Sequence, residues 1–164
     1  MTAGLFPEEN VNDIFFSRHD EQELLGSASH HPFTLDGKEW PTAEHYYQAM
    51  LFDNETLQDK IRAQPDAKAA ITFTKWRFLQ KKKDWKKLRQ VLMTRAVYTK
   101  CKTYPAVAEH LLETGDKKLV ENSAYDYFWG CGRDRRAENT YGKVMMNVRE
   151  KLRNEFETSL NASE

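Results

Sequence analysis

The sequence has few residues that could cross-link the chain covalently or through a metal. Its 164 residues include two cysteines, Cys101 and Cys131, each alone among charged or aromatic neighbours. Two isolated thiols do not make a disulfide framework or a zinc site. A chain of this length buries roughly 70% of the surface that it exposes when unfolded, so it needs neither device to be stable. We therefore expect a reduced environment.

Long apolar runs and an excess of one charge are also missing. No stretch approaches the ~20 apolar residues of a membrane span, and the first ten residues lack the apolar run of a signal peptide. The 25 basic and 25 acidic residues balance, which excludes general attraction to nucleic acid or anionic membranes as the main binding force. We predict a cytoplasmic protein with no membrane contact.

Common cofactor and nucleotide motifs are absent too. The chain contains no G-x-x-x-x-G-K-[ST], no G-x-G-x-x-G and no G-x-S-x-G, which are typical of nucleotide hydrolysis, dinucleotide redox chemistry and acyl transfer. Among the five histidines, His30 and His31 are adjacent, and adjacent histidines rarely share one ion. The sequence therefore predicts neither a cofactor nor a metal.

The residues that are present predict an α+β fold, mainly helical, in a single domain over residues 11–157, with flexible termini at 1–10 and 158–164. Short β-favouring runs at residues 14–16 and 33–35, the second followed by the turn dipeptide Asp36 and Gly37, predict a small sheet near the N-terminus. A further brief strand is expected within residues 118–121.

Helical spacing of apolar residues then dominates the chain. Thr42 is expected to cap a helix that reaches Leu51, and a second helix is expected over residues 54–63. A third begins near Pro65 and Asp66, with proline in its first turn. Another helix is expected to be capped by Asp84, and its inward face holds Trp85, Leu88, Val91, Leu92 and Tyr98 or Thr99. A short helix closed by Gly115 follows. The last expected helix is capped by Asn139 or Thr140 and runs from Tyr141 to Phe156.

Glu44 is the first candidate for chemistry, because the cap at Thr42 places it in the first turn of a helix. Free N–H groups and the positive end of the helix dipole stabilise an anion there by about 0.3–1 kcal/mol, so the carboxylate should stay ionised. Gln48 lies one turn later and can hydrogen-bond to it or to a ligand. Acidic residues are also common in first turns for stability alone, which is the alternative interpretation.

Asp126 lies among Tyr125, Tyr127, Phe128 and Trp129 in an expected loop over residues 125–138. Aromatic faces stack on planar bases, and a nearby carboxylate can hydrogen-bond a base or ribose hydroxyls. Partial burial would suit this carboxyl to donating a proton. A solvated turn residue among core aromatics is the alternative interpretation.

Trp85 follows the cationic run at residues 81–83. A phosphorylated ligand that carries a base would use both, because lysines pair with phosphates and an indole stacks on a base. The alternative is a core tryptophan beside a solvated lysine run, which is the more common situation.

The order of motifs resembles the YbiA-like, or NADAR, family. Residues 36–49 read DGKEWPTAEHYYQA, which is similar to that family's "DGxxWPTxEHYYQA" signature. Three further blocks follow in the family's order: Asp84 with Trp85, then Leu119 to Glu121 with Asp126, Trp129 and Gly130, then Asn139 to Gly142 with Met146 and Arg149. Together the blocks span most of residues 14–152.

The resemblance implies hydrolysis of N-glycosidic bonds without cofactor or metal. In some members the substrates are phosphoribosyl intermediates of riboflavin synthesis, and in others they are ADP-ribose attached to guanine, free or in nucleic acid. By position, the family's site residues fall on Glu44, Trp85 and Asp126, which we expect to converge on one cleft as the catalytic group. The expected substrate-binding residues are His45, Tyr47, Gln48, Trp129, Gly130, Asn139 and Lys83.

Departures from the family's pattern bear on specificity. Gly26 to Ala28 stand where members often have Ser-Asn-Phe, Leu51 stands where Lys is common, and residues 71–83 do not match. Residues 81–83 would then supply the contacts to the ligand's phosphate in place of the missing family residues. The favoured substrate is an ADP-ribosylated guanine, and the rivals are a non-catalytic ADP-ribose reader and a helical module whose basic face at residues 75–89 docks an acidic partner.

Overall fold

The computed structural model describes residues 12–163, in which two compact units are distinguished. The central unit is Arg18–Ala108, and the terminal unit combines Met1–Ser17 with Glu109–Glu164. The described residues form six α-helices, one 3-10 helix and four strands, so the mainly helical α+β prediction is confirmed. The N-terminal segment predicted to be flexible lies outside the described residues.

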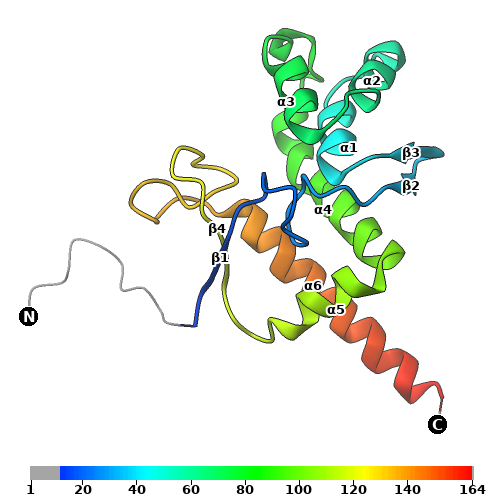
Figure 1. The fold of residues 1–164 in the computed structure, drawn as a ribbon, viewed down its shortest axis with the longest axis vertical. Coiled ribbons are helices and arrows are strands. Elements are labelled where there is room, and N and C mark those ends of the chain that lie inside the picture. Colours follow the sequence, from blue (N-terminus) through cyan, green and yellow to red (C-terminus); the bar gives the residue numbers. More distant parts are fainter. Residues whose placement is uncertain (1–11, 164) are drawn as a thin grey trace, which may run out of the picture. The chain divides into compact units, whose positions relative to one another are not determined.

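The central unit opens with the predicted hairpin, drawn in blue and cyan in Figure 1. β2 (Phe33–Leu35) pairs antiparallel with β3 (Lys38–Trp40). Asp36 and Gly37 both have positive φ, at 52° and 76°, as a tight two-residue hairpin turn requires. Asp36 then accepts hydrogen bonds from the Tyr46 hydroxyl and the Arg95 guanidinium, which fixes the turn to two helices.

Side-chain caps begin three helices of the central unit. Thr42 accepts from the His45 N–H, Asn54 from the Leu57 N–H, and Asp66 from the Ala69 N–H. Pro65 therefore precedes the cap, and the prediction of proline in the first turn was wrong by two residues. The elements are α1 (Ala43–Met50), α2 (Glu55–Arg62), α3 (Ala67–Lys75), the 3-10 helix η1 (Phe78–Gln80) and α4 (Trp85–Thr103). α1 packs against α2, α3 and α4, so the first turn of α1 is enclosed.

α4 differs from its prediction at both its cap and its face. Asp84 occupies the N-cap position, but its side chain makes no capping hydrogen bond. Val91 is exposed, and the buried side of the helix carries Leu92, Met93, Ala96, Val97, Lys100 and Cys101. The sequence did not predict this buried side because it includes Lys100, and lysines are almost never fully buried unless they are paired.

The terminal unit contains a second, separate pair of strands. β1 (Ile14–Phe16) runs parallel to β4 (Leu119–Glu121), which continues into a long loop and then α6 (Thr140–Asn161). The prediction of one N-terminal sheet was therefore wrong, since β1 pairs with a strand about a hundred residues later along the chain. α5 (Pro105–Glu113) precedes β4 and is followed by Gly115 with positive φ, as predicted.

α6 packs against β4 through a stripe that includes Tyr141, Val144, Met145, Val148 and Leu152. The prediction that Phe156 belongs to this stripe was wrong, because its side chain is exposed. The helix also continues to Asn161, so it includes residues 158–161 of the segment that the sequence predicts to be flexible. No helix among residues 12–163 is both long and apolar enough to cross a membrane.

Candidate active site

Glu44 lies in the first turn of α1, and its side chain is completely buried. Its Oε2 accepts hydrogen bonds from Arg18 Nη1 at 2.7 Å and from Ser27 Oγ at 2.6 Å. Its Oε1 accepts from Gln48 Nε2 at 2.9 Å, which confirms the predicted contact one turn along the helix. Three donors from the central unit therefore hold both carboxylate oxygens.

This arrangement keeps Glu44 ionised. Burial by itself would raise the pKa of this carboxyl, because a charge in a poorly solvated site is disfavoured. The positive charge of Arg18 and the hydrogen bonds from Ser27 and Gln48 outweigh burial and lower the pKa below its ordinary value. The predicted ionised state thus has a further cause besides the helix terminus, a buried ion pair.

Further contacts fix the groups that hold Glu44. Thr74 donates to Gln48 Oε1 at 2.7 Å, which orients the amide so that its nitrogen faces Glu44. Lys100 Nζ donates to the carbonyls of Leu24 and Gly26, at 2.7 and 2.8 Å, and to Ser29 Oγ at 2.5 Å. The buried ammonium thereby holds residues 24–29, the segment that carries Ser27.

Sequence reasoning missed Arg18, Thr74 and Lys100, and it treated Ser27 only as a departure from the family. Each lies at least 17 positions from its partner in these contacts, so no local pattern could link them. A lysine on the buried stripe of a helix was the one available signal, since such a residue must have partners inside the protein.

His45 follows Glu44 and uses both ring nitrogens within the central unit. Nε2 lies 2.9 Å from the Gln64 carbonyl, which only accepts, so Nε2 carries the proton and Nδ1 accepts from the Thr42 hydroxyl at 2.8 Å. Burial lowers the pKa of His45, which keeps the ring neutral at neutral pH. This geometry favours a structural role, and the substrate contacts of His45 and of the buried Tyr47 stay predictions.

Trp85 begins α4, and three cations surround its indole, of which only Lys81 belongs to the run at residues 81–83 that the sequence predicted. Lys81 Nζ lies 4.3 Å from the ring centroid, and Lys86 and Arg89 each place a charge at 5.7 Å. Burial and the neighbouring Arg89 lower the pKa of Lys81. Lys83 is exposed, and its part in phosphate binding stays a prediction from the lysine run alone.

Asp126 lies in the terminal unit, in the loop between β4 and α6. Its Oδ1 accepts from the backbone N–H groups of Phe128 and Trp129, at 3.1 and 2.8 Å, which is a local turn. Trp129 packs edge-on against Phe128 and Tyr141. A Cβ added to Gly130 would lie 2.6 Å from the Ser123 carbonyl oxygen, so this position accepts only glycine without movement.

Asn139 connects α6 to β4 instead of capping the helix. Its backbone is left-handed, with φ of 48°, and its side chain makes no capping bond. Oδ1 accepts from the Glu121 N–H and Nδ2 donates to the Leu119 carbonyl, both at 2.9 Å. Glu121 is a second buried carboxylate, bonded to Ser123, which sequence reasoning noted only as part of a motif. Substrate contact by Asn139 stays a prediction.

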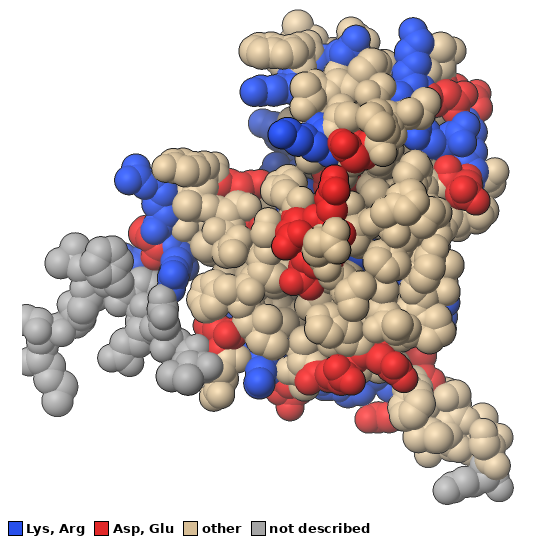
Figure 2. Space-filling view, viewed as in Figure 1, with Lys and Arg blue, Asp and Glu red and all other residues tan. Residues whose placement is uncertain are grey.

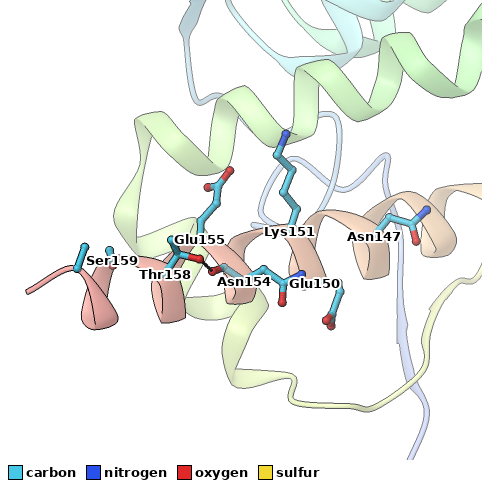
Figure 3. Close-up of a pocket in the computed structure, with 8 residues that line it drawn as sticks. Asn147, Glu150, Lys151, Asn154, Glu155, Thr158 and Ser159 are labelled. Atoms are coloured by element: carbon cyan, nitrogen blue, oxygen red, sulfur yellow. Dashed lines mark hydrogen bonds between the residues drawn. The ribbon is translucent and has the colours of Figure 1, made fainter. Parts of the chain in front are cut away.

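A surface hollow in the terminal unit lies elsewhere. It runs along the C-terminal half of α6, and the side chains that line it include Asn147, Lys151 and Asn154 (Figure 3). None of the predicted site residues lines it. Within residues 12–163, no group of three or more His, Cys, Asp or Glu side chains could hold a metal ion.

The sequence profile of the NADAR domain matches residues 5–153. The chain belongs to the NADAR domain family. The match spans residues of both units, including every site residue described above.

Named relatives of this NADAR domain include an N-glycosidase of Nostoc punctiforme, 37% identical over 129 residues that make up 77% of the chain and 83% of the relative. The N-glycosidase YbiA of Escherichia coli is 31% identical over 138 residues, or 84% of the chain and 86% of the relative. A riboflavin biosynthesis protein of Vibrio vulnificus is 36% identical over 140 residues, which cover 85% of the chain but 38% of that protein.

The NMR structure of Escherichia coli YbiA has the same fold. It superimposes on this NADAR domain with a TM-score of 0.78 at 28% sequence identity, covering 93% of this chain and 94% of the other. The predicted family and fold class are therefore confirmed.

Proposed function

We propose that this NADAR domain is an N-glycosidase that hydrolyses the bond between a nitrogen base and an ADP-ribosyl or phosphoribosyl sugar, with ADP-ribosylated guanine as the favoured substrate. Family membership and relatives named N-glycosidases support the reaction class. The observation that carries the proposal in this chain is Glu44, a buried carboxylate held ionised by three donors at the start of α1. Stability alone does not require a charge at such a position.

The reaction assigns distinct tasks to the three predicted catalytic residues. The bond from C1′ of the sugar to the base nitrogen breaks, the base takes a proton, and water adds to C1′. Positive charge develops on the sugar during this step, and a fixed carboxylate stabilises it. Glu44 would supply that charge or activate the water, Asp126 would hold the ribose hydroxyls or protonate the base, and Trp85 would stack on the base.

Burial of Glu44 adds a condition to this mechanism. Its oxygens are already occupied by Arg18, Ser27 and Gln48, so a sugar reaches the carboxylate only if one of these donors exchanges for it. Otherwise Glu44 acts indirectly, by positioning Gln48 against the substrate. In the first case Gln48→Ala changes KM and kcat less than Glu44→Gln does, and in the second case the two variants lose activity alike.

The activity is tested with an ADP-ribosylated guanine nucleoside, by following free guanine and ADP-ribose by chromatography. Turnover supports the proposal, and saturable binding without release would make the protein a reader. Functional coupling of Glu44 and Asp126 is tested with the double variant. If both residues act on one substrate, the fold-loss of activity in the double variant should be smaller than the product of the two single-variant losses, because the effects of residues that work as a unit are not additive.

A phosphoribosyl substrate is the second candidate. The Vibrio vulnificus relative named as a riboflavin biosynthesis protein favours it, although the chain spans only 38% of that protein. The same assay with a phosphoribosylated aminopyrimidine compares the two substrates directly through their kcat/KM values. A larger value for the aminopyrimidine would reverse the order that we propose.

A further inference from the structure

The segment between α3 and the first turns of α4 exposes large apolar side chains among cations. Trp76 is 79% exposed, Phe78 57% and Leu79 86%. Residues 75–89 contain eight lysines and arginines and one acid, in a chain whose total formal charge is zero. We name this surface the aromatic basic strip and define it as residues 75–89. In Figure 2, several Lys and Arg side chains gather over the end of the central unit that α2 and α3 form in Figure 1.

Backbone hydrogen bonds fix the turn that exposes these side chains to solvent. The Arg77 and Gln80 N–H groups donate to the carbonyls of Thr74 and Arg77, and the Lys82 N–H donates to the Leu51 carbonyl at 2.8 Å. The Arg77 guanidinium packs 4.0 Å from the Phe73 ring centroid and donates to the Phe73 carbonyl. The exposed apolar side chains are therefore part of a turn fixed by hydrogen bonds, and exposed apolar surface rimmed by polar residues is typical of binding sites.

We propose that the aromatic basic strip binds single-stranded nucleic acid. The consequence of this binding for turnover rests on the proposed function, whereas the binding itself does not. Rings interleaved with cations match a single strand, whose unpaired bases stack on aromatic faces while its phosphates pair with lysine and arginine.

The two tryptophans of the strip repeat this pairing of ring and charge. Lys75 Nζ lies 5.5 Å from the Trp76 ring centroid, and Lys81 Nζ lies 4.3 Å from that of Trp85. A base stacked on either indole would have an ammonium within reach of its phosphate. Since Trp85 is also the proposed stacking residue of the active site, a strand bound along the strip would lead to the reaction.

Other anionic partners fit less well. An acidic peptide would satisfy the lysines but leave Trp76, Phe78 and Leu79 uncovered. A membrane surface is bound by longer amphipathic helices, and η1 has only three residues. Duplex nucleic acid keeps its bases stacked internally, so it offers the exposed rings nothing to stack on.

Binding is tested by fluorescence anisotropy with a labelled single strand longer than the ~4–16 nucleotides that one small domain covers. We expect Trp76→Ala/Phe78→Ala to weaken binding at least about fivefold. The matched control is Phe156→Ala/Leu160→Ala, which removes two exposed apolar side chains from α6 and should leave the affinity unchanged. Equal loss in both double variants, or no loss in either, would overturn the proposal.

The charge contribution is measured from the salt dependence of the same affinity. Lys75→Gln/Lys87→Gln should reduce the slope of log K against log salt by about 1.4, since each phosphate contact to a single strand contributes about 0.7. Lys118→Gln/Lys143→Gln, at exposed lysines of the terminal unit, should not change it. Tighter binding to the duplex of the same sequence, to an acidic peptide or to phosphatidylserine vesicles would also contradict the proposal.

A turnover comparison separates this proposal from the proposed function. Trp76→Ala/Phe78→Ala should cleave the free ADP-ribosylated guanine nucleoside like the unmodified protein, while kcat/KM for the same base within a single strand falls at least about fivefold. Equal kcat/KM losses on both substrates would reject the strip as a strand-binding surface. Strand binding without cleavage of either substrate would instead reject the proposed function and leave the binding surface intact.

Discussion

Arg18 and Glu44 form a buried ion pair at 2.7 Å, with 6% and 0% of their side chains exposed. Twenty-six residues separate them in the sequence, and the loop that follows β1 brings them together at the first turn of α1. A buried pair of this kind contributes little net stability, but removal of one partner leaves an uncompensated charge in the interior. The pair therefore marks a site that the fold maintains at a cost in stability.

Removal of the Arg18 charge should destabilise the protein strongly. We expect Arg18→Met to lower the free energy of unfolding by about 3–5 kcal/mol at neutral pH, because Glu44 loses its positive partner. The loss should shrink as the pH falls below 4.5, the ordinary pKa of the carboxyl, since the unfolded chain then binds the proton that the native pair excludes. Urea unfolding curves between neutral and acid pH measure it. A loss that does not change with pH would contradict the assignment, and Arg18→Lys is the control that retains the charge.

Glu44→Gln tests the catalytic role of the carboxylate. From the motif we would expect this variant to fold normally, but its buried contacts predict a loss of about 3 kcal/mol, because Arg18 then faces a neutral amide. If the variant remains folded, we expect kcat to fall at least about 100-fold. The double variant Glu44→Gln/Gln48→Glu keeps one carboxylate and one amide among the same donors, so it should recover stability without recovering turnover. Full activity in Glu44→Gln would remove this residue from the mechanism.

Lys100 should make stability depend on pH in the alkaline range. Burial lowers the pKa of Lys100 from 10.5 to about 8, although the neighbouring Cys101 and Glu23 act in the opposite direction. Between these two values the unfolded chain holds a proton that the native protein has released, so stability should rise with pH by up to about 1.4 kcal/mol per unit. Lys100→Met should lack this rise. Parallel pH profiles of unfolding free energy for the two proteins would show that Lys100 does not titrate in this way.

Gly130→Ala should distort the loop that carries Asp126. The new Cβ would lie 2.6 Å from the Ser123 carbonyl oxygen and 2.8 Å from that of Asp126, so the backbone must move, at a cost of about 1–3 kcal/mol. We also expect kcat/KM to fall if Asp126 takes part in the reaction. Gly115→Ala is the matched control, since it has positive φ but no atom within 4 Å of the new Cβ, and it should destabilise without affecting turnover. An active, stable Gly130→Ala protein would count against the close packing of this loop.

Local patterns were sufficient wherever the interacting groups lie within a few residues of each other. Thr42, Asn54 and Asp66 cap their helices because each side chain reaches an N–H three residues on, and Asp36 with Gly37 turns the hairpin because both accept positive φ. The contact from Gln48 to Glu44 spans one helical turn, so the spacing alone predicted it.

Tertiary structure alone decided the features whose partners are distant in the chain. The pairing of β1 with β4, the bond from Arg18 to Glu44 and the three acceptors around Lys100 join segments tens of residues apart, for which the sequence carries no spacing rule. The failed cap at Asn139 has the same cause, because Asn139 uses its side chain to bind the backbone of β4. The sequence by itself thus determined which helices form and that Glu44 lies in the first turn of one of them. Only the folded chain determined which charged side chains contact Glu44, because hydrogen bonds between remote segments form only after those segments pack.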